Sequence, residues 1–442
     1  MSNDWLTMSM GDLGRGIGAG RIDPVALTET YLNAIKAHKF QDRIYARLTE
    51  DRALTEAAAA SRRAASGHRL GLLDGVPISW KDLFDTAGVA TEAGSALLKD
   101  RVPERDAEVL RNATAQGLVC LGKTHMSELA FSGLGLNPVT ATSPCVNDYD
   151  AVSGGSSSGA ATSVAFHLAA GAVGSDTGGS VRIPAAWNDL VGLKTTSGRL
   201  SSKGVVPLAA RFDTVGPLCR TVEDAALMLS VLEGRSAVDL RGASLKGMRL
   251  LVLENGLEGA RGEPLSGFES AIGRLMDNGA VVRRVHSPIV DEALAMSGVL
   301  FTTEAYATWQ NEIEAQPDLM FAEILERFRA GGQFSGVDYV RAWQRLDQIR
   351  EAYHSAVAGY DAVVMPTSPI MPPIVSRLLN DHDYYVEENL WALRNTRIGN
   401  LMGSCGLSLP TGLPSTGIML LGAPMAEERL LRLGAACEAV LA

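Results

Sequence analysis

The sequence predicts an α/β protein with a mixed β-sheet, and three observations support this fold class. Short apolar segments that resemble strands alternate with longer helical patterns along the whole chain. No Gly-, Pro- or Ser-rich linker cleanly divides the chain, and no internal repeat is evident. With 442 residues, 46% of them hydrophobic, the chain can bury a large core.

The first part of the chain supplies helices and then short strands. Residues 26–66 are rich in alanine and charged residues with helical spacing, so they predict one or two surface helices. Within residues 71–88, a glycine and a proline precede a strand-like segment. Residues 106–117 predict a helix with an acidic start, and residues 118–122 predict a short strand that a glycine ends.

The segment 153–159, SGGSSSG, has two interpretations. Its composition is that of a flexible linker. However, residues 160–170 follow directly with a nearly uncharged helical pattern, which is typical of a buried helix. Serines at the start of such a helix can cap its free amide groups. We therefore expect the N-terminus of a helix here.

The remainder of the chain continues the alternation. Residues 248–254 and 280–286 read as strands, and residues 335–357 read as a long polar helix. Another strand at 360–366 precedes a proline-rich loop. The tail predicts a strand pair and a final amphipathic helix at 427–441.

Composition excludes several classes of protein. Forty Lys and Arg against fifty Asp and Glu give a formal charge of −10, so we expect no direct nucleic-acid partner. The N-terminus lacks the layout of a signal peptide, and no apolar run reaches the roughly 18 residues of a membrane span. Five scattered cysteines without a C-x-x-C pattern predict neither a disulfide framework nor a zinc site. These features favour a reducing cytoplasm.

Two well-known patterns match the sequence only literally. Residues 117–124, GLVCLGKT, fit the phosphate-loop expression, but their four central residues favour a buried strand over a flexible turn. Residues 155–159, GSSSG, fit a nucleophile elbow centred on Ser157. The segment before them is loop-like, and no later histidine stands out as a base. We therefore expect neither a nucleotide site nor an α/β-hydrolase.

No metal and no cofactor are expected. His125 and Glu128 have the i,i+3 spacing of one helix face, but no third ligand is visible and H-E-x-x-H is absent. Residues 381–383, Asp-His-Asp, are expected to form a solvated loop.

Lys81 is the candidate base, because the histidines are weak candidates. An unperturbed lysine, with a pKa near 10.4, is neutral in only about one molecule in a thousand at pH 7.4. Burial disfavours the ammonium form and can lower this pKa by several units. Lys81 lies among apolar neighbours in PISWKDLFD, which is the setting that such a shift requires.

Three sequence blocks resemble the amidase signature family. They are GVPISWKD, SGGSSSGAA and GSDTGGSVRIPAAW, and they occur in the family's order. Their spacing is also similar, since 75 residues separate Lys81 from Ser156 and 24 separate Ser156 from Ser180. The resemblance is strong over residues 71–232, moderate in the tail, and nearly uninformative over 240–360.

The resemblance implies a fold, a domain organisation and an activity. The fold would be a central mixed sheet with helices on both faces, and the activity would be hydrolysis of a small carboxylic amide without a cofactor. The chain would form a single domain, 1–442, in four parts: N-terminal helices (1–70), the signature core (71–232), a variable substrate-side region (233–364) and a C-terminal return to the core (365–442).

The resemblance also implies a role for each residue of a catalytic triad. Ser180 would be the nucleophile, Ser156 the relay serine and Lys81 the base. The peptide that leads into the relay serine, Gly155–Ser156, would be cis. Neutral Lys81 would take a proton from Ser156, which takes one from Ser180, and the same path would return the proton to the leaving nitrogen.

The residues around the nucleophile have supporting roles in this scheme. The amides of Thr177, Gly178, Gly179 and Ser180 match the family's oxyanion hole. Asp176 and Arg182 are expected to brace this loop, although Arg182 could instead bind a substrate carboxylate. Ser157 and Ile183 are expected to support the substrate or the loop. The chain departs from the family pattern at Ser158, Ile183, Trp187-Asn188-Asp189 and Thr195, so the substrate is not identified.

Two further functions remain open beside the free-standing amidase, which would bind a small-molecule amide and could be a homodimer. One is the amidase-like component of the glutamine-dependent tRNA amidotransferase, which supplies ammonia to a partner subunit. That component is usually somewhat longer, and its glutamine pocket is not recognisable in this chain's middle third, so we favour the free-standing enzyme. The other is a hydrolase of a urea-like acid of the allophanate or carboxybiuret type. Such a charged substrate needs an arginine, and Arg345 and Arg397 are the candidates.

Overall fold

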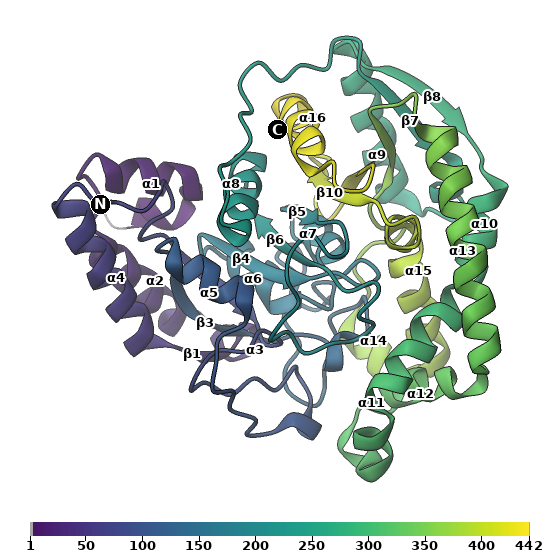
Figure 1. Cartoon of the computed structure of the whole chain (residues 1–442), viewed down its shortest axis with the longest axis horizontal. Helices are drawn as coiled ribbons and strands as arrows, with labels where there is room; N and C mark the ends of the chain where they lie inside the picture. The colour runs from purple at the N-terminus through teal and green to yellow at the C-terminus, as the bar shows by residue number, and fades with distance from the viewer. Residues whose placement is uncertain (1–2, 442) are drawn as a thin grey trace.

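A central β-sheet organises the fold (Figure 1). The computed structural model describes residues 3–441. Its strands are β1 (Tyr45–Leu48), β2 (Pro77–Lys81), β3 (Val119–Thr124), β4 (Gly171–Ser175), β5 (Val191–Lys194), β6 (Val215–Cys219), β7 (Arg249–Leu253), β8 (Val281–Val285), β9 (Ala362–Pro366), β10 (Cys405–Pro410) and β11 (Gly417–Gly422). Within the described residues they form one 11-stranded sheet in the order β1-β3-β2-β4-β6-β5-β10-β11-β9-β7-β8.

The sheet is mixed, as the sequence predicted. Strand β2 pairs in parallel with β3 and β4, and β7 pairs in parallel with β8 and β9. The other neighbours are antiparallel. The predicted α/β class is confirmed, and the region 240–360 contributes strands to the same sheet as the signature blocks.

Helices surround this sheet and gather at its two ends. The helices are α1 (Met10–Gly18), α2 (Pro24–Ala37), α3 (Gln41–Ile44), α4 (Glu50–Ala65), α5 (Glu108–Ala115), α6 (Ser158–Ala165), α7 (Arg182–Trp187), α8 (Val222–Glu233), α9 (Gly262–Asp277), α10 (Pro288–Ala295), α11 (Thr303–Ala315), α12 (Ala322–Arg329), α13 (Gly336–Val357), α14 (Val375–Asn380), α15 (His382–Leu401) and α16 (Glu427–Leu441). In Figure 1, α1, α2 and α4 lie at one end of the molecule and α10 to α13 at the other.

Helices cover both faces of the sheet, and β10 shows this directly. Leu407 points toward α16, because a Cβ added at Gly434 would lie 2.2 Å from its Cδ2. The preceding residue, Gly406, faces α7, because a Cβ there would lie 3.3 Å from Cδ of Arg182. Successive side chains of a strand point to opposite faces, so α16 and α7 lie on opposite sides of the sheet.

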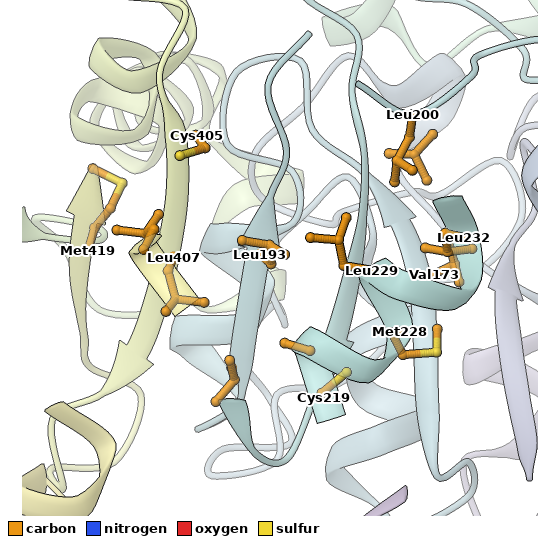
Figure 2. Packing of buried hydrophobic residues seen from close by; sticks show 14 of the residues in the cluster. Val173, Leu193, Leu200, Cys219, Met228, Leu229, Leu232, Cys405, Leu407 and Met419 are labelled. Carbon is orange, nitrogen blue, oxygen red and sulfur yellow. The ribbon is translucent and has the colours of Figure 1, made fainter. Parts of the chain in front are cut away.

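The main hydrophobic core fills the space between the sheet and the helices on the α16 face. Figure 2 shows Leu193 of β5 and Leu407 of β10 beside Met228 and Leu229 of α8. All four side chains are buried. Burying an apolar side chain of this size contributes about 1.5–3 kcal/mol to folding. This packing holds the strands that carry the candidate site residues in place.

Most predicted elements are confirmed, with three corrections. The helix expected over 160–170 begins at Ser158 and ends at Ala165, shortly before His167, whose φ of +58° is incompatible with a continuing helix. His125 is not on a helix, since it directly follows β3. Residues 381–383 are not a solvated loop, because Asp381 caps the N-terminus of α15 by accepting from the amide of Tyr384 (3.0 Å).

The sequence did not predict one of the strands. Strand β1 lies between the helices of residues 26–66 and pairs antiparallel with β3. Residues 119–124 of the phosphate-loop match form β3 itself, as expected for a buried apolar segment. Among residues 3–441, no helix combines the length and apolar character needed to cross a membrane.

Candidate active site

The segments that carry the candidate residues meet at one edge of the sheet. Lys81 and Ser175 end the neighbouring parallel strands β2 and β4. Ser180 lies in the loop between β4 and α7, and Ser156 lies just before α6. The carboxyl ends of parallel strands are where α/β sheets bind ligands, because the following loops converge there.

Lys81 is buried and contacts two serines. Its Nζ donates hydrogen bonds to Ser156 Oγ (2.7 Å) and Ser175 Oγ (2.8 Å). Within residues 3–441 it has no ion-pair partner at salt-bridge distance. Burial lowers its pKa to about 7, although Asp176 and Asp213 nearby oppose this shift. Lys81 is thus available as a neutral amine near neutral pH.

A second buried lysine shows that burial alone does not make such a site. Lys194 is also fully buried, and burial lowers its pKa to about 8. Its Nζ donates to the backbone oxygens of Ser404 (2.7 Å) and Thr195 (3.0 Å). Carbonyl oxygens have no proton to give, so Lys194 cannot activate a nucleophile as Lys81 can through Ser156.

Backbone contacts hold the segment of Ser156. The Gly155–Ser156 peptide is cis, as the resemblance implied. A Cβ at Gly155 would lie 2.6 Å from Ser127 Oγ, so the packing there requires glycine. Ser157 donates its amide to Ser180 O (3.2 Å) and its hydroxyl to Ser175 O (3.2 Å). This residue therefore joins three segments of the site, and its side chain does not cap α6.

The loop from Thr177 to Ser180 presents unengaged amides. In the described part of the chain, no backbone oxygen accepts from the N–H groups of these four residues. Gly179 has a φ of +144°, and a Cβ there would lie 2.1 Å from Thr396 Oγ1. Thr396 Oγ1 also donates to Gly178 O (2.7 Å), which fixes the loop from the α15 side. Such a run of rigid amides can bind a developing oxyanion.

Asp176 and Arg182 form a buried ion pair behind this loop. Arg182 donates through Nη2 to Asp176 Oδ1 (2.9 Å) and through Nε to Oδ2 (3.0 Å). Asn400 donates to the same carboxylate (3.0 Å). Burial by itself would raise the pKa of Asp176, but the Arg182 guanidinium outweighs this effect and lowers the pKa well below its usual range. Since Arg182 is occupied by Asp176, it braces the loop and is not free for a substrate.

Removing the charge of Asp176 should therefore destabilise the protein strongly. Asp176→Asn leaves the buried Arg182 without its counter-ion, which typically costs about 3–5 kcal/mol in free energy of unfolding. Asp239→Asn is the matched control, because Asp239 pairs with Arg241 at the exposed surface (2.8 Å). Urea denaturation should show a clear loss for Asp176→Asn and none for Asp239→Asn. Equal midpoints for both variants would contradict this role of the pair.

The two arginine candidates have different surroundings. Arg345 pairs with Glu292 at the surface (2.6 Å) and does not reach the site, so its candidacy as a carboxylate ligand is wrong. Arg397 of α15 lines the same narrow pocket, of about 20 Å³, as Ser180. Ile183 is buried in the apolar cluster beneath Gly179 and supports the loop without facing the pocket.

The structure adds residues that the sequence did not indicate. Ser175 lies within the GSDTGGS block, so its neighbourhood was a usable signal. Phe131, Phe301 and Arg327 line the pocket with Ser180, and no local pattern marked them. A separate cavity of about 340 Å³ near Tyr353 contains none of the predicted site residues, so volume alone does not indicate the site.

Comparison with known proteins identifies the family. The sequence model of the amidase family matches residues 26–431. The chain belongs to the amidase signature family. It is an amidohydrolase that acts on C–N bonds.

The relatives of this amidase differ in what they do. It is 34% identical to 2-amino-5-chloromuconic acid deaminase of Comamonas testosteroni, over 88% of this chain and 87% of that protein. It is 32% identical to the amidase-like component of the glutamyl-tRNA(Gln) amidotransferase of an Anaeromyxobacter species, over 98% of this chain and 96% of that protein. A solved amidase structure superimposes with a TM-score of 0.88 at 30% identity, covering 98% of this chain and 100% of that chain. Length therefore does not separate the free-standing amidase from the amidotransferase component.

Proposed function

We propose that this enzyme hydrolyses a small carboxylic amide through an acyl-enzyme on Ser180. Neutral Lys81 takes the proton of Ser156, Ser156 takes the proton of Ser180, and Ser180 Oγ attacks the amide carbonyl. The proton returns along the same path to the nitrogen, which leaves as ammonia or an amine. Water then attacks the acyl-enzyme by the same route and releases the acid.

The contact between Lys81 Nζ and Ser156 Oγ carries this proposal. A lysine with a pKa of about 7 is neutral in about half of the molecules at pH 7, on the order of a thousand times more than an exposed lysine. Lys81 reaches a hydroxyl that can pass a proton onward, at 2.7 Å. The amides of Thr177 to Ser180 are the proposed oxyanion hole, and one such donor is worth about 2.7–4 kcal/mol of barrier.

The rate should depend on pH through Lys81. Below its pKa the ammonium form cannot accept a proton, so kcat/KM should fall about tenfold per pH unit below pH 7. Above pH 7 the neutral amine dominates, and kcat/KM should level off. Ammonia release from butyramide between pH 5.5 and 8.5 measures this profile, because that substrate does not titrate in the range. A profile that is flat from pH 5.5 to 7 would exclude Lys81 as the base.

An activity panel separates the free-standing enzyme from the amidotransferase component. The amidotransferase alternative is favoured by one observation, the match to the Anaeromyxobacter protein over 98% of this chain. The panel contains glutamine, asparagine, aliphatic amides and ω-amide acids, with ammonia as the readout. Turnover of a non-glutamine amide supports the free-standing hydrolase. Weak release from glutamine alone supports the amidotransferase component.

The acid in the name of the Comamonas relative supports testing amides of unsaturated dicarboxylic acids as well. For the compartment we propose a reducing cytoplasm, because all five cysteines are free and buried. A homodimer also stays a prediction, which size-exclusion chromatography with light scattering would test.

A further inference from the structure

Two arginines converge on the pocket that contains Ser180. Arg327 of α12 and Arg397 of α15 line this pocket and also an outer cavity of about 250 Å³. The stem of Arg397 passes close to the proposed oxyanion loop, since a Cβ at Gly178 would lie 3.7 Å from its Cγ. The Arg327 guanidinium lies 4.5 Å from the ring centre of Phe131, which also lines the Ser180 pocket.

Neither guanidinium is neutralised by the protein. Between residues 3 and 441, no carboxylate lies at salt-bridge distance from either arginine, and Arg327 Nη1 is buried without a hydrogen-bond partner. Both side chains are half-buried. Burial lowers the pKa of both groups, and Arg327 lowers the pKa of Arg397 further. Two like charges held close together without a counter-ion are unfavourable, so a bound anion would relieve the repulsion.

Acidic residues at the rim do not supply that anion. Glu323 and Glu326 also line the outer cavity. Glu323 instead lies 2.8 Å from Nδ1 of the exposed His382. Neither glutamate pairs with Arg327 or Arg397 in the described structure, so the two cations remain available to a ligand.

We propose that the substrate is a small amide that also carries a carboxylate, and that Arg327 and Arg397 bind this carboxylate while the amide carbonyl faces Ser180. A guanidinium presents planar N–H groups that match a carboxylate, and it is less strongly hydrated than an ammonium. The outer cavity lies at the lower end of ligand-pocket volumes, which favours a short acid. This inference rests on the proposed function, because Ser180 defines where the amide lies.

Matched substrates test the specificity. Succinamate and glutaramate differ from butyramide and valeramide by a carboxylate in place of a methyl group. For at least one pair, kcat/KM should be about 10- to 100-fold higher for the acid, since charge-assisted hydrogen bonds are lost with the neutral amide. Arg327→Met and Arg397→Met should each remove most of this preference. Arg345→Met, which alters only the surface pair with Glu292, should retain it. No preference in the unaltered enzyme, or an equal preference in all variants, would overturn the proposal.

A binding experiment separates this inference from the hydrolase proposal. Succinate and glutarate are added to the Ser180→Ala variant, and the melting temperature is followed. The proposal expects at least one diacid to raise it, and Arg397→Met in the same background to abolish the rise. Without ligand, Arg397→Met should not lower the melting temperature, because it relieves the repulsion from Arg327. If neither diacid raises it, or the rise survives in Arg397→Met, the anion site is refuted even if amides are hydrolysed. Arginine-dependent binding without any amide turnover would instead retain the site and refute the hydrolase.

Discussion

Ser180→Ala should reduce the rate of amide hydrolysis by on the order of 10⁴-fold or more while leaving the fold intact. The loss is large because no acyl-enzyme can form without the Ser180 hydroxyl. The fold should be retained because the backbone contact of Ser180 O with the Ser157 amide (3.2 Å) does not involve the hydroxyl. Ammonia release measures the rate, and circular dichroism with a thermal melt measures the fold.

The control for this variant is Ser376→Ala, which alters an exposed serine on α14. It should have the activity and the melting temperature of the unaltered protein. If Ser180→Ala keeps a rate within tenfold of the unaltered protein, then Ser180 is not the nucleophile. If its melting temperature falls with its rate, the loss of activity does not report on chemistry.

Lys81→Met should reduce the rate by about 10²- to 10⁴-fold, the usual contribution of a general base. Methionine retains much of the buried volume of Lys81, so the core around β2 stays filled. The double variant Lys81→Met/Ser180→Ala should be hardly slower than Ser180→Ala alone, because residues that act as one unit do not have additive effects. Ammonia release from the three variants completes this comparison.

Lys203→Met is the matched control, since the Lys203 side chain is 86% exposed and makes only a long contact with Glu108. It should leave the rate unchanged. Full activity in Lys81→Met would show that another group acts as the base. A double variant that is slower than Ser180→Ala by the whole Lys81 factor would mean that the two residues act independently.

The central part of the site was predictable because its chemistry lies in short sequence blocks. Lys81 and Ser180 are carried by segments whose strand, turn and glycine patterns are local properties of the chain. Ser175 was missed although it lies in the same block as Ser180. It becomes significant only when β4 pairs beside β2 and brings its hydroxyl to 2.8 Å from Lys81 Nζ.

The arginines could not be assigned from the sequence for a different physical reason. The alternation of buried Ile324 and Phe328 with polar residues predicts an amphipathic helix, but it does not show what the Arg327 side of that helix meets. Arg345 and Arg397 are equally plausible in the sequence. Only tertiary packing places Arg345 opposite Glu292 and Arg397 beside Gly178.

The fold was predicted with similar limits. Long periodic segments such as residues 335–357 were recognised, and α13 spans nearly the same residues. The four-residue strand β1 was not recognised, since a short segment between helices has no period of its own. It is stabilised as a strand by pairing with β3, which is a long-range contact.

The most direct test of the proposed mechanism is to find which residue is acylated. The protein is mixed with p-nitrophenyl butyrate, quenched in acid during the first turnover, digested and mapped by mass spectrometry. The mechanism predicts a butyryl group on Ser180 and none in the Ser180→Ala variant. It also predicts that Lys81→Met slows acylation without moving its position. A butyryl group on Ser156, Ser175 or a cysteine would contradict the assignment of Ser180 as the nucleophile.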